Sequence, residues 1–141
     1  MTTPRIFTVA EAERTLPLVR RIVGDLMLTY PLWREAMARY EVLTGPVRAD
    51  QGETAEVLEA QAAATALAAR IHGYLQELEQ IGCVFKGFDA GLVDFYALRD
   101  DRLVFLCWKL GEERITHWHD VDSGFAGRQP IDAAMLTETR A

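Results

Sequence analysis

The stretch LVDFYALRDDRLVFLCWKL, residues 92–110, decides the fold. It contains two runs of apolar, aromatic and β-branched residues, 92–98 and 103–110, which are typical of strands. Asp100-Asp101 between the runs suits a two-residue hairpin turn. This turn fixes the register of the two strands, so that three pairs share one side of the sheet: Leu98 with Leu103, Tyr96 with Phe105, and Asp94 with Cys107.

The two faces of this predicted hairpin differ in chemistry, because successive side chains of a strand point to opposite faces. One face carries no charge, and we expect it to pack on helices: it holds Val93, Phe95, Ala97, Val104, Leu106 and Trp108. The other face, called the mixed face below, combines apolar side chains with Asp94 and Cys107.

A third strand is expected at residues 114–118, after a short turn. A two-residue loop would put Thr116 and Trp118 on the mixed face. A three-residue loop would put His117 and His119 there instead, because a slip of one residue moves every side chain to the opposite face. The sequence leaves both registers open.

Helices are predicted before the strands. Thr8 and Glu11 form a capping-box pattern that begins a helix. Proline inside a helix removes a hydrogen bond and clashes with the preceding turn, so we expect a short helix over residues 9–16 and a second helix from Pro17 to Gly45.

A further helix has apolar residues at unbroken steps of three and four, which indicates a helix lying along another at a shallow angle: Val57, Ala60, Ala64, Leu67, Ile71, Tyr74, Leu78 and Ile81. Gly82 is expected to end it. Residues 44–52 form the connection, which makes the first part of the chain a long antiparallel helical hairpin. The apolar seam of this hairpin could also serve a second copy of the chain.

Together these elements predict an α+β domain, in which a long antiparallel helical hairpin packs on a small three-stranded antiparallel sheet. The 141 residues suit a single domain. We expect the helical hairpin in residues 7–82, the sheet in 83–119, and a loop with a C-terminal tail in 120–141. A short helix is expected near Ala133.

The net charge of −6 and the pI near 5.0 argue against a nucleic-acid partner or an anionic membrane surface, which need a surplus of basic residues. No apolar run approaches the length of a membrane span, and the N-terminal residues do not resemble a secretory signal. The expected location is therefore the cytoplasm. In that reducing compartment Cys83 and Cys107, which lie among apolar residues, are expected to be buried free thiols.

The segments GLVDF, LCWKLGE, ITHWH and GFAGRQP, together with the opening FTVAEAERTLPLVR, resemble a group of short bacterial proteins catalogued as domain of unknown function family 2203. The matching positions include Asp94, Cys107, Trp108, Gly111, Glu112, Ile115, Trp118, His119, Gly124, Phe125 and Arg128. The chain departs from the group at Tyr96, where proline is usual, and at Gly87, where aspartate is usual. The group carries no established activity, so the resemblance supports the architecture and leaves the function open.

Five polar residues are candidate metal ligands: Asp94, Cys107, Glu112, His117 and His119. Such donors suit a divalent transition metal, zinc or iron, which we expect as the cofactor. In the alternative without a metal, Cys107 is a buried thiol, His117 is exposed and His119 bonds a backbone carbonyl. A further alternative is a Cys107 nucleophile with His119 as its base.

Arg128 and Lys86 are candidate binding residues for a small anionic ligand, because a guanidinium or ammonium group pairs with carboxylate or phosphate. An internal pair of Arg128 with Asp94 or Glu112 is the alternative. Two functions remain open. The first is a small cytoplasmic metal- or ligand-binding protein, with metal-assisted chemistry if it is an enzyme. The second is a non-catalytic homo-oligomeric interaction module, and a homodimer is expected.

Overall fold

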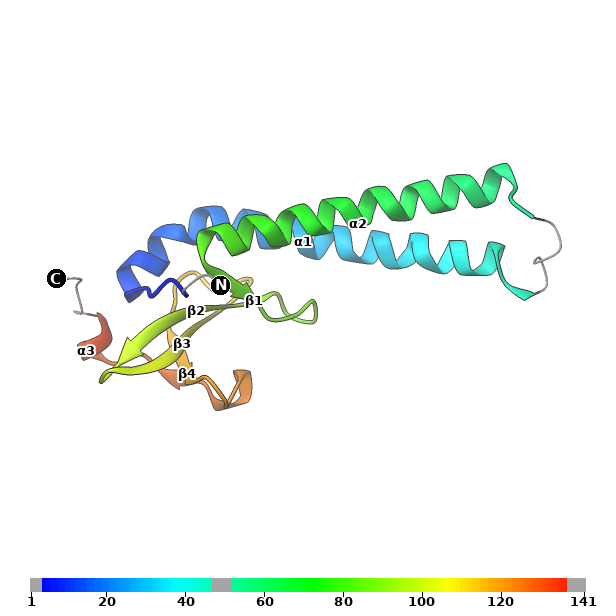
Figure 1. Ribbon diagram of the computed structural model, residues 1–141. Coiled ribbons are helices and arrows are strands. Elements are labelled where there is room, and N and C mark those ends of the chain that lie inside the picture. The colour runs from blue at the N-terminus through cyan, green and yellow to red at the C-terminus, as the bar shows by residue number, and fades with distance from the viewer. Residues whose placement is uncertain (1–3, 47–51, 137–141) are drawn as a thin grey trace.

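The computed structural model describes residues 4–46 and 52–136, and it confirms the α+β architecture. Two long helices pack against an antiparallel sheet (Figure 1). Residues 47–51 of the predicted connection lie outside the described residues. The elements follow in the order α1 (Val9–Leu43), α2 (Ala55–Ile81), β1 (Cys83–Phe85), β2 (Leu92–Arg99), β3 (Arg102–Lys109), β4 (His117–Asp120), the 3-10 helix η2 (Phe125–Gly127), β5 (Gln129–Pro130) and α3 (Ala133–Leu136).

Helix α1 is continuous, so the prediction of two helices meeting at Pro17 is wrong. The helix begins as expected, with Thr8 and Glu11 forming the capping box. Pro17 lies inside the helix with its ring exposed, while Leu16 and Val19 on either side of it are buried in the core. This packing holds the backbone helical against a local cost of about 3 kcal/mol for an internal proline.

Helix α2 follows the cap residue Thr54, which the sequence did not single out, and it ends before Gly82, as predicted. Gly82 has a φ of 106°, in the left-handed region that glycine adopts without a steric penalty. The half of the hairpin away from the sheet projects beyond it (Figure 1). In the described part of α1, no residue after Thr29 is buried, since the sheet does not cover this half of the hairpin.

Among the described residues the sheet has five strands in the order β1-β2-β3-β4-β5, all antiparallel, so the prediction of three strands is wrong. The two additional strands are the outer ones. In β1, Cys83 pairs with Phe95, and in β5, Gln129 pairs with Trp118. Strand β5 has only two residues, too few to show an alternation of apolar and polar residues in the sequence.

The register of β2 and β3 is the predicted one, with Asp94 opposite Cys107. Asp100 and Asp101 have φ values of 50° and 62°, so both turn residues take the left-handed conformation that a two-residue hairpin turn requires. Strand β4 begins at His117 rather than at residue 114, and it places His117 opposite Cys107. The histidines of β4 therefore lie on the mixed face, the arrangement expected for the three-residue loop.

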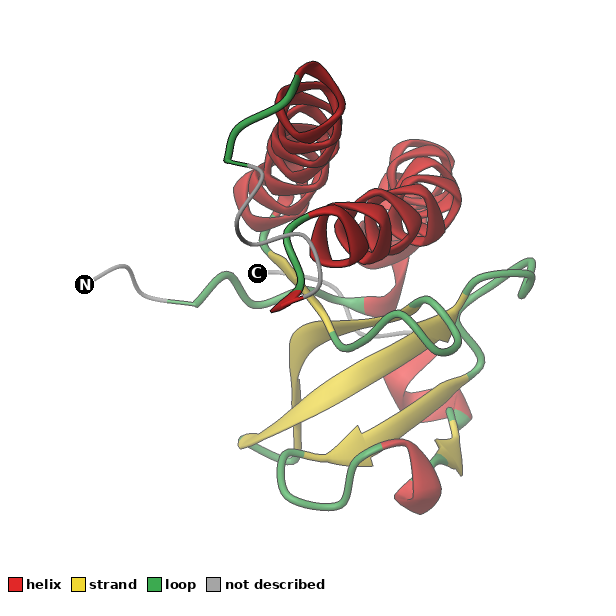
Figure 2. Ribbon diagram, turned by 90° about the vertical axis from the view of Figure 1, so that its right-hand side faces the viewer, coloured by secondary structure: helices red, strands yellow, loops and turns green. Residues whose placement is uncertain are grey.

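The uncharged face of the sheet packs on the helices, and both long helices lie on the same side of the sheet (Figure 2). All six residues predicted for this face are buried. Phe7, which precedes α1, packs edge-to-face on Phe95 with ring centroids 5.1 Å apart, and its backbone N–H donates to the Tyr96 carbonyl. Among the described helices, none has a stretch long and apolar enough to span a lipid bilayer.

Replacing Pro17 by alanine should stabilise the protein. The change restores the hydrogen bond to the carbonyl of residue 13 and removes the ring clash, so we expect the free energy of unfolding to rise by about 1–3 kcal/mol. Urea denaturation measures this change. The neighbouring exposed Leu18 provides the control, because Leu18→Ala should change stability by less than about 0.5 kcal/mol. A less stable Pro17→Ala variant would contradict this account of α1.

Candidate metal centre

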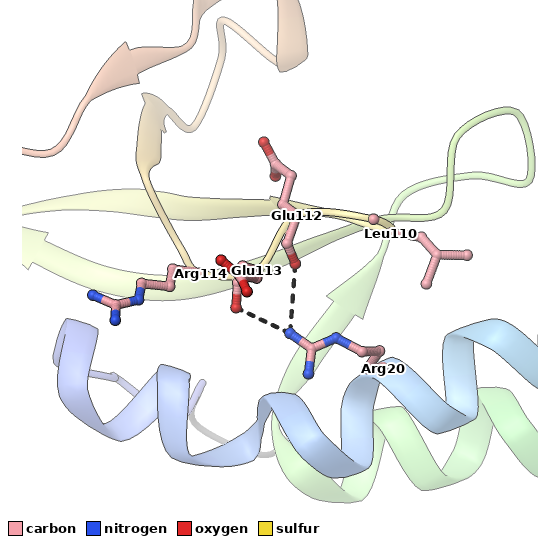
Figure 3. A pocket seen from close by; sticks show the side chains of 6 residues that line it. Arg20, Leu110, Glu112, Glu113 and Arg114 are labelled. Carbon is pink, nitrogen blue, oxygen red and sulfur yellow. Dashed lines mark hydrogen bonds between the residues drawn. The ribbon is translucent and has the colours of Figure 1, made fainter.

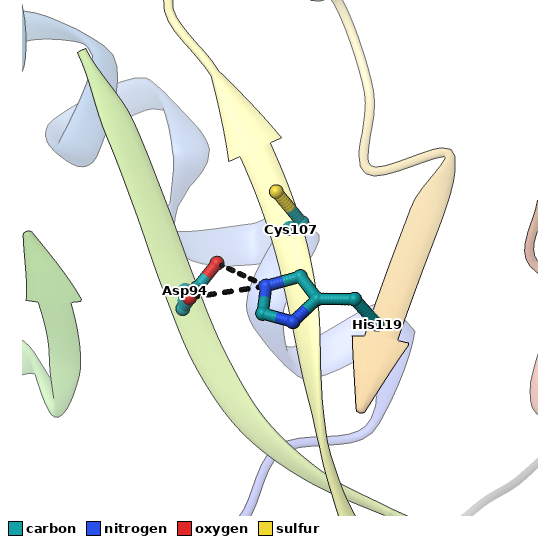
Figure 4. Close-up of side chains that lie close together, drawn as sticks. All are labelled: Asp94, Cys107 and His119. Atoms are coloured by element: carbon teal, nitrogen blue, oxygen red, sulfur yellow. Dashed lines mark hydrogen bonds and ion pairs between the residues drawn. The ribbon is translucent and has the colours of Figure 1, made fainter. Parts of the chain in front are cut away.

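Three adjacent strands bring Asp94, Cys107 and His119 together on the mixed face (Figure 4). Asp94 stands on β2 directly opposite Cys107 on β3, and His119 on β4 is opposite Phe105. One donor atom from each residue lies within 4.8 Å of the other two. Within residues 4–46 and 52–136, this is the set of three carboxylate, thiol or imidazole side chains spaced to hold a metal ion.

All three residues are buried, although the mixed face is the one turned away from the long helices. Aromatic side chains shield them: the Phe105 ring lies 5.5 Å from the His119 ring and 4.7 Å from the Tyr96 ring. A buried carboxylate is costly unless it is paired, because it has lost its water. Asp94 therefore needs its partners in the cluster.

The hydrogen bonds of the His119 ring indicate which positive species can lie between the ring and the Asp94 carboxylate. Its Nδ1 lies 2.7 Å from the Asp120 carbonyl oxygen, which can only accept, so Nδ1 carries a proton. In the neutral ring Nε2 then presents a lone pair, and it faces both Asp94 carboxylate oxygens at 3.2 Å. Two sets of lone pairs cannot face each other in a buried site without a positive species between them. That species is either a proton, on the ring or on the carboxylate, or a metal ion.

Burial raises the pKa values of the other two groups of the cluster, the Asp94 carboxyl and the Cys107 thiol. It raises the pKa of the Asp94 carboxyl above its usual value, while His119 and Lys86 oppose that rise. Burial also raises the pKa of the Cys107 thiol to about 12, and the negative charge of Asp94 adds to this effect. With protons as the only cations present, Cys107 is therefore a thiol at neutral pH, which argues against a free thiolate nucleophile.

Lys86 is the exposed neighbour of the cluster. Its Nζ lies 3.9 Å from Asp94 Oδ2 and 4.7 Å from the centre of the Phe105 ring. Its side chain is 41% exposed, against 4% for that of Asp94. The sequence predicts Lys86 as an anion-binding residue but does not indicate that it lies beside Asp94. That contact follows from β1, in which Val84 pairs with Asp94 and Lys86 lies two residues further along the chain.

The structure places Glu112, Arg128 and His117 outside this cluster. The Glu112 carboxylate accepts from Arg128 Nη2 at 2.8 and 3.1 Å, which is the internal pairing foreseen as the alternative for Arg128. Arg128 also donates to the Cys107 carbonyl and so ties the loop to β3. His117 shares a hydrogen bond of 2.8 Å with the Thr116 hydroxyl and is partly exposed.

A shallow hollow of about 560 Å³ lies between α1 and the segment after β3 (Figure 3). Arg20 crosses it and donates to the carbonyls of Glu112 and Glu113, at 3.5 and 3.0 Å. The Arg20 guanidinium also faces Trp108, which points away from Cys107 because neighbouring strand residues alternate. The hollow therefore lies on the helix side of the sheet and is separate from the cluster.

Residues 5–131 match the model of a family described as "Uncharacterized conserved protein (DUF2203)". The chain belongs to this family. The match confirms the resemblance drawn from the sequence, and all three cluster residues lie inside the matched region. No match was found among the curated proteins or among the solved structures.

The raised thiol pKa values predict a shifted titration in protein without added metal. Thiolate absorbance in the ultraviolet should appear only near pH 12 in the folded protein, and near 9.0, the ordinary value, after unfolding. Because the folded thiols keep protons that the unfolded thiols release, stability should fall as pH rises from about 9 towards about 12. The variant Cys83→Ala isolates the Cys107 signal. A folded thiol that titrates near 9.0 would show that Cys107 is accessible.

Proposed function

We propose that this protein binds a divalent transition metal, zinc or iron, through Asp94, Cys107 and His119. The observation that carries the proposal is the convergence of three donors: His119 Nε2 lies 3.2 Å from both Asp94 oxygens, with the Cys107 thiol within 4.8 Å. Oxygen, nitrogen and sulfur donors converge there from three rigid strands. A mixed donor set of this kind suits zinc best and iron next.

The spacing of the donors supports this proposal. In tetrahedral zinc sites, nitrogen and oxygen ligands lie about 2.0 Å and sulfur about 2.3 Å from the ion, which sets neighbouring donors about 3.3–3.6 Å apart. The distance from His119 Nε2 to each Asp94 oxygen is 3.2 Å. All three donors lie within 4.8 Å of one another, so small side-chain rotations suffice to close the set.

The electrostatics also favour a cation. A metal ion bound at the cluster would displace the thiol proton of Cys107, because coordination lowers a thiol pKa strongly. The carboxylate and the thiolate would then balance the two positive charges of the metal. The bond from His119 Nδ1 to the Asp120 carbonyl orients the ring with Nε2 towards the ion, as backbone carbonyls do around many metal sites.

Three protein ligands leave one position of a tetrahedral metal open, as in catalytic rather than structural zinc sites. A water bound there is acidified towards neutral pH, so hydrolysis or another metal-assisted reaction is the activity class we propose. We place this chemistry in the cytoplasm, since Cys83 and Cys107 are both free and a reducing compartment keeps thiols available.

Metal analysis after equilibration with zinc or cobalt(II) tests the proposal. We expect one ion per chain, with a thiolate-to-cobalt absorption band. Both should be lost in His119→Ala and in Cys107→Ser, because two protein donors rarely hold such an ion. His117→Ala is the matched control: it lies on the same face of the same strand and should bind metal normally. Circular dichroism separates loss of metal from loss of folding. A folded wild type that takes up no stoichiometric metal would overturn the proposal.

We infer a second candidate function, homodimerisation through the helical hairpin. Leu28 and Val42 of α1 are 73% and 71% exposed, and residues 60–69 of α2 carry no charge. A hollow of about 570 Å³ runs between the two helices, with Leu32 and Leu67 in its lining. The lining also includes Glu35, Arg39 and Glu59, and exposed apolar patches bordered by polar residues commonly mark an interaction site.

Light scattering across a range of protein concentrations tests this second candidate. We expect the mass of a dimer for the wild type and of a monomer for Leu32→Glu, because burying a carboxylate at the interface carries a large cost in lost hydration. Leu18→Glu changes an exposed leucine at the sheet end of α1 and should remain dimeric. A wild type that stays monomeric at high concentration would exclude this function.

A further inference from the structure

We infer that the open metal position binds a carboxylate with an apolar chain, and that Lys86 selects it. This inference rests on the proposed metal site and names the class of its ligand.

The charge balance calls for a single negative charge. A divalent metal is neutralised by the Asp94 carboxylate and the Cys107 thiolate, while His119 contributes no charge as a neutral ligand. Asp94 then no longer serves as the counter-ion of Lys86, which lies 3.9 Å from it. The site as a whole carries one positive charge. A monoanion on the open position restores neutrality, whereas a phosphate dianion would leave an excess negative charge in a largely buried site.

Lys86 is placed to meet such an anion. Its ammonium contacts the cluster through Asp94 and also reaches solvent, since the side chain is 41% exposed. The other cation considered for this role, Arg128, is already neutralised by Glu112 at 2.8 Å. Only two of the 15 basic residues in the chain are lysines, Lys86 and Lys109. An ammonium is a compact point charge on a flexible stem, which suits it to a ligand that must enter and leave.

Beyond Lys86 the mixed face becomes apolar. The residue pairs that follow Asp94 and Cys107 towards the hairpin turn are Tyr96 with Phe105 and Leu98 with Leu103. They share the face because residues two apart on a strand point the same way, about 7 Å further along for each pair. Leu98 and Leu103 are both partly exposed. The Phe105 ring is buried and lies 4.7 Å from the Lys86 ammonium, so a carboxylate held at the metal and Lys86 would lay its chain along this strip, over Tyr96 towards Leu98 and Leu103.

Ligand titrations of the cobalt(II)-loaded protein, followed by the visible cobalt spectrum, test the inference. The probes are acetate, octanoate and inorganic phosphate. We expect octanoate to bind about tenfold more tightly than acetate, because part of its chain is buried on the strip. Phosphate should bind more weakly than either carboxylate.

The lysine variants give the decisive comparison. Lys86→Met should weaken both carboxylates about tenfold, the worth of a charge-assisted hydrogen bond in a partly exposed site. Lys109→Met removes the other lysine and should leave both affinities unchanged. Leu98→Ser should weaken octanoate and spare acetate.

The outcomes separate the two proposals. Cobalt uptake with the same carboxylate affinity in Lys86→Met and the wild type would overturn the role of Lys86 and leave the metal site standing. Tighter binding of phosphate than of carboxylates, or equal binding of acetate and octanoate, would overturn the ligand class. A folded protein that takes up no cobalt would overturn the proposed function, and this inference with it.

Discussion

The register of the β2–β3 hairpin is the constraint on which the rest of the structure depends. Asp100 and Asp101 alone join the two strands, and both have the left-handed conformation. A turn this short allows a single pairing register for the two strands. It sends Trp108 towards the helices and its neighbour Cys107 to the opposite face. A slip of one residue would put the Asp94 carboxylate beneath the helical hairpin, among apolar side chains, and would expose the present core face to water.

The same register explains why ionisable groups can be buried on the face that the long helices leave uncovered. Each member of the cluster meets another: His119 faces the Asp94 carboxylate, Cys107 stands opposite Asp94, and Lys86 approaches from the rim. By contrast, Arg128 and Glu112 neutralise each other and bind the loop to the sheet. The Arg128–Glu112 pair is thus internally complete, whereas the cluster of Asp94, Cys107 and His119 is the proposed site of a metal ion.

The cluster has no compact signature in the sequence, since its members come from three strands. Residues 94, 107 and 119 are separated by a two-residue turn in one case and by a long irregular segment in the other. Strands hold their side chains more rigidly than loops do, which favours fixed donor spacing. The segment after β3 is anchored at several points: Arg20 of α1 bonds its carbonyls, and the Trp108 indole donates to the Glu112 carbonyl. These contacts fix the path by which β4, and with it His119, reaches the mixed face.

The sequence by itself determined the elements whose signals lie within a few neighbouring residues: the cap at Thr8, the end of α2 at Gly82, the β2–β3 register and its uncharged face. In each of them backbone geometry or strand alternation leaves one low-energy solution. Only the tertiary structure decided that α1 runs through Pro17, that the short strand β5 joins the sheet beside β4, that the β4 histidines share a face with Asp94 and Cys107, and that Arg128 pairs with Glu112. These features depend on packing between distant segments and on loop paths, for which no local pattern exists.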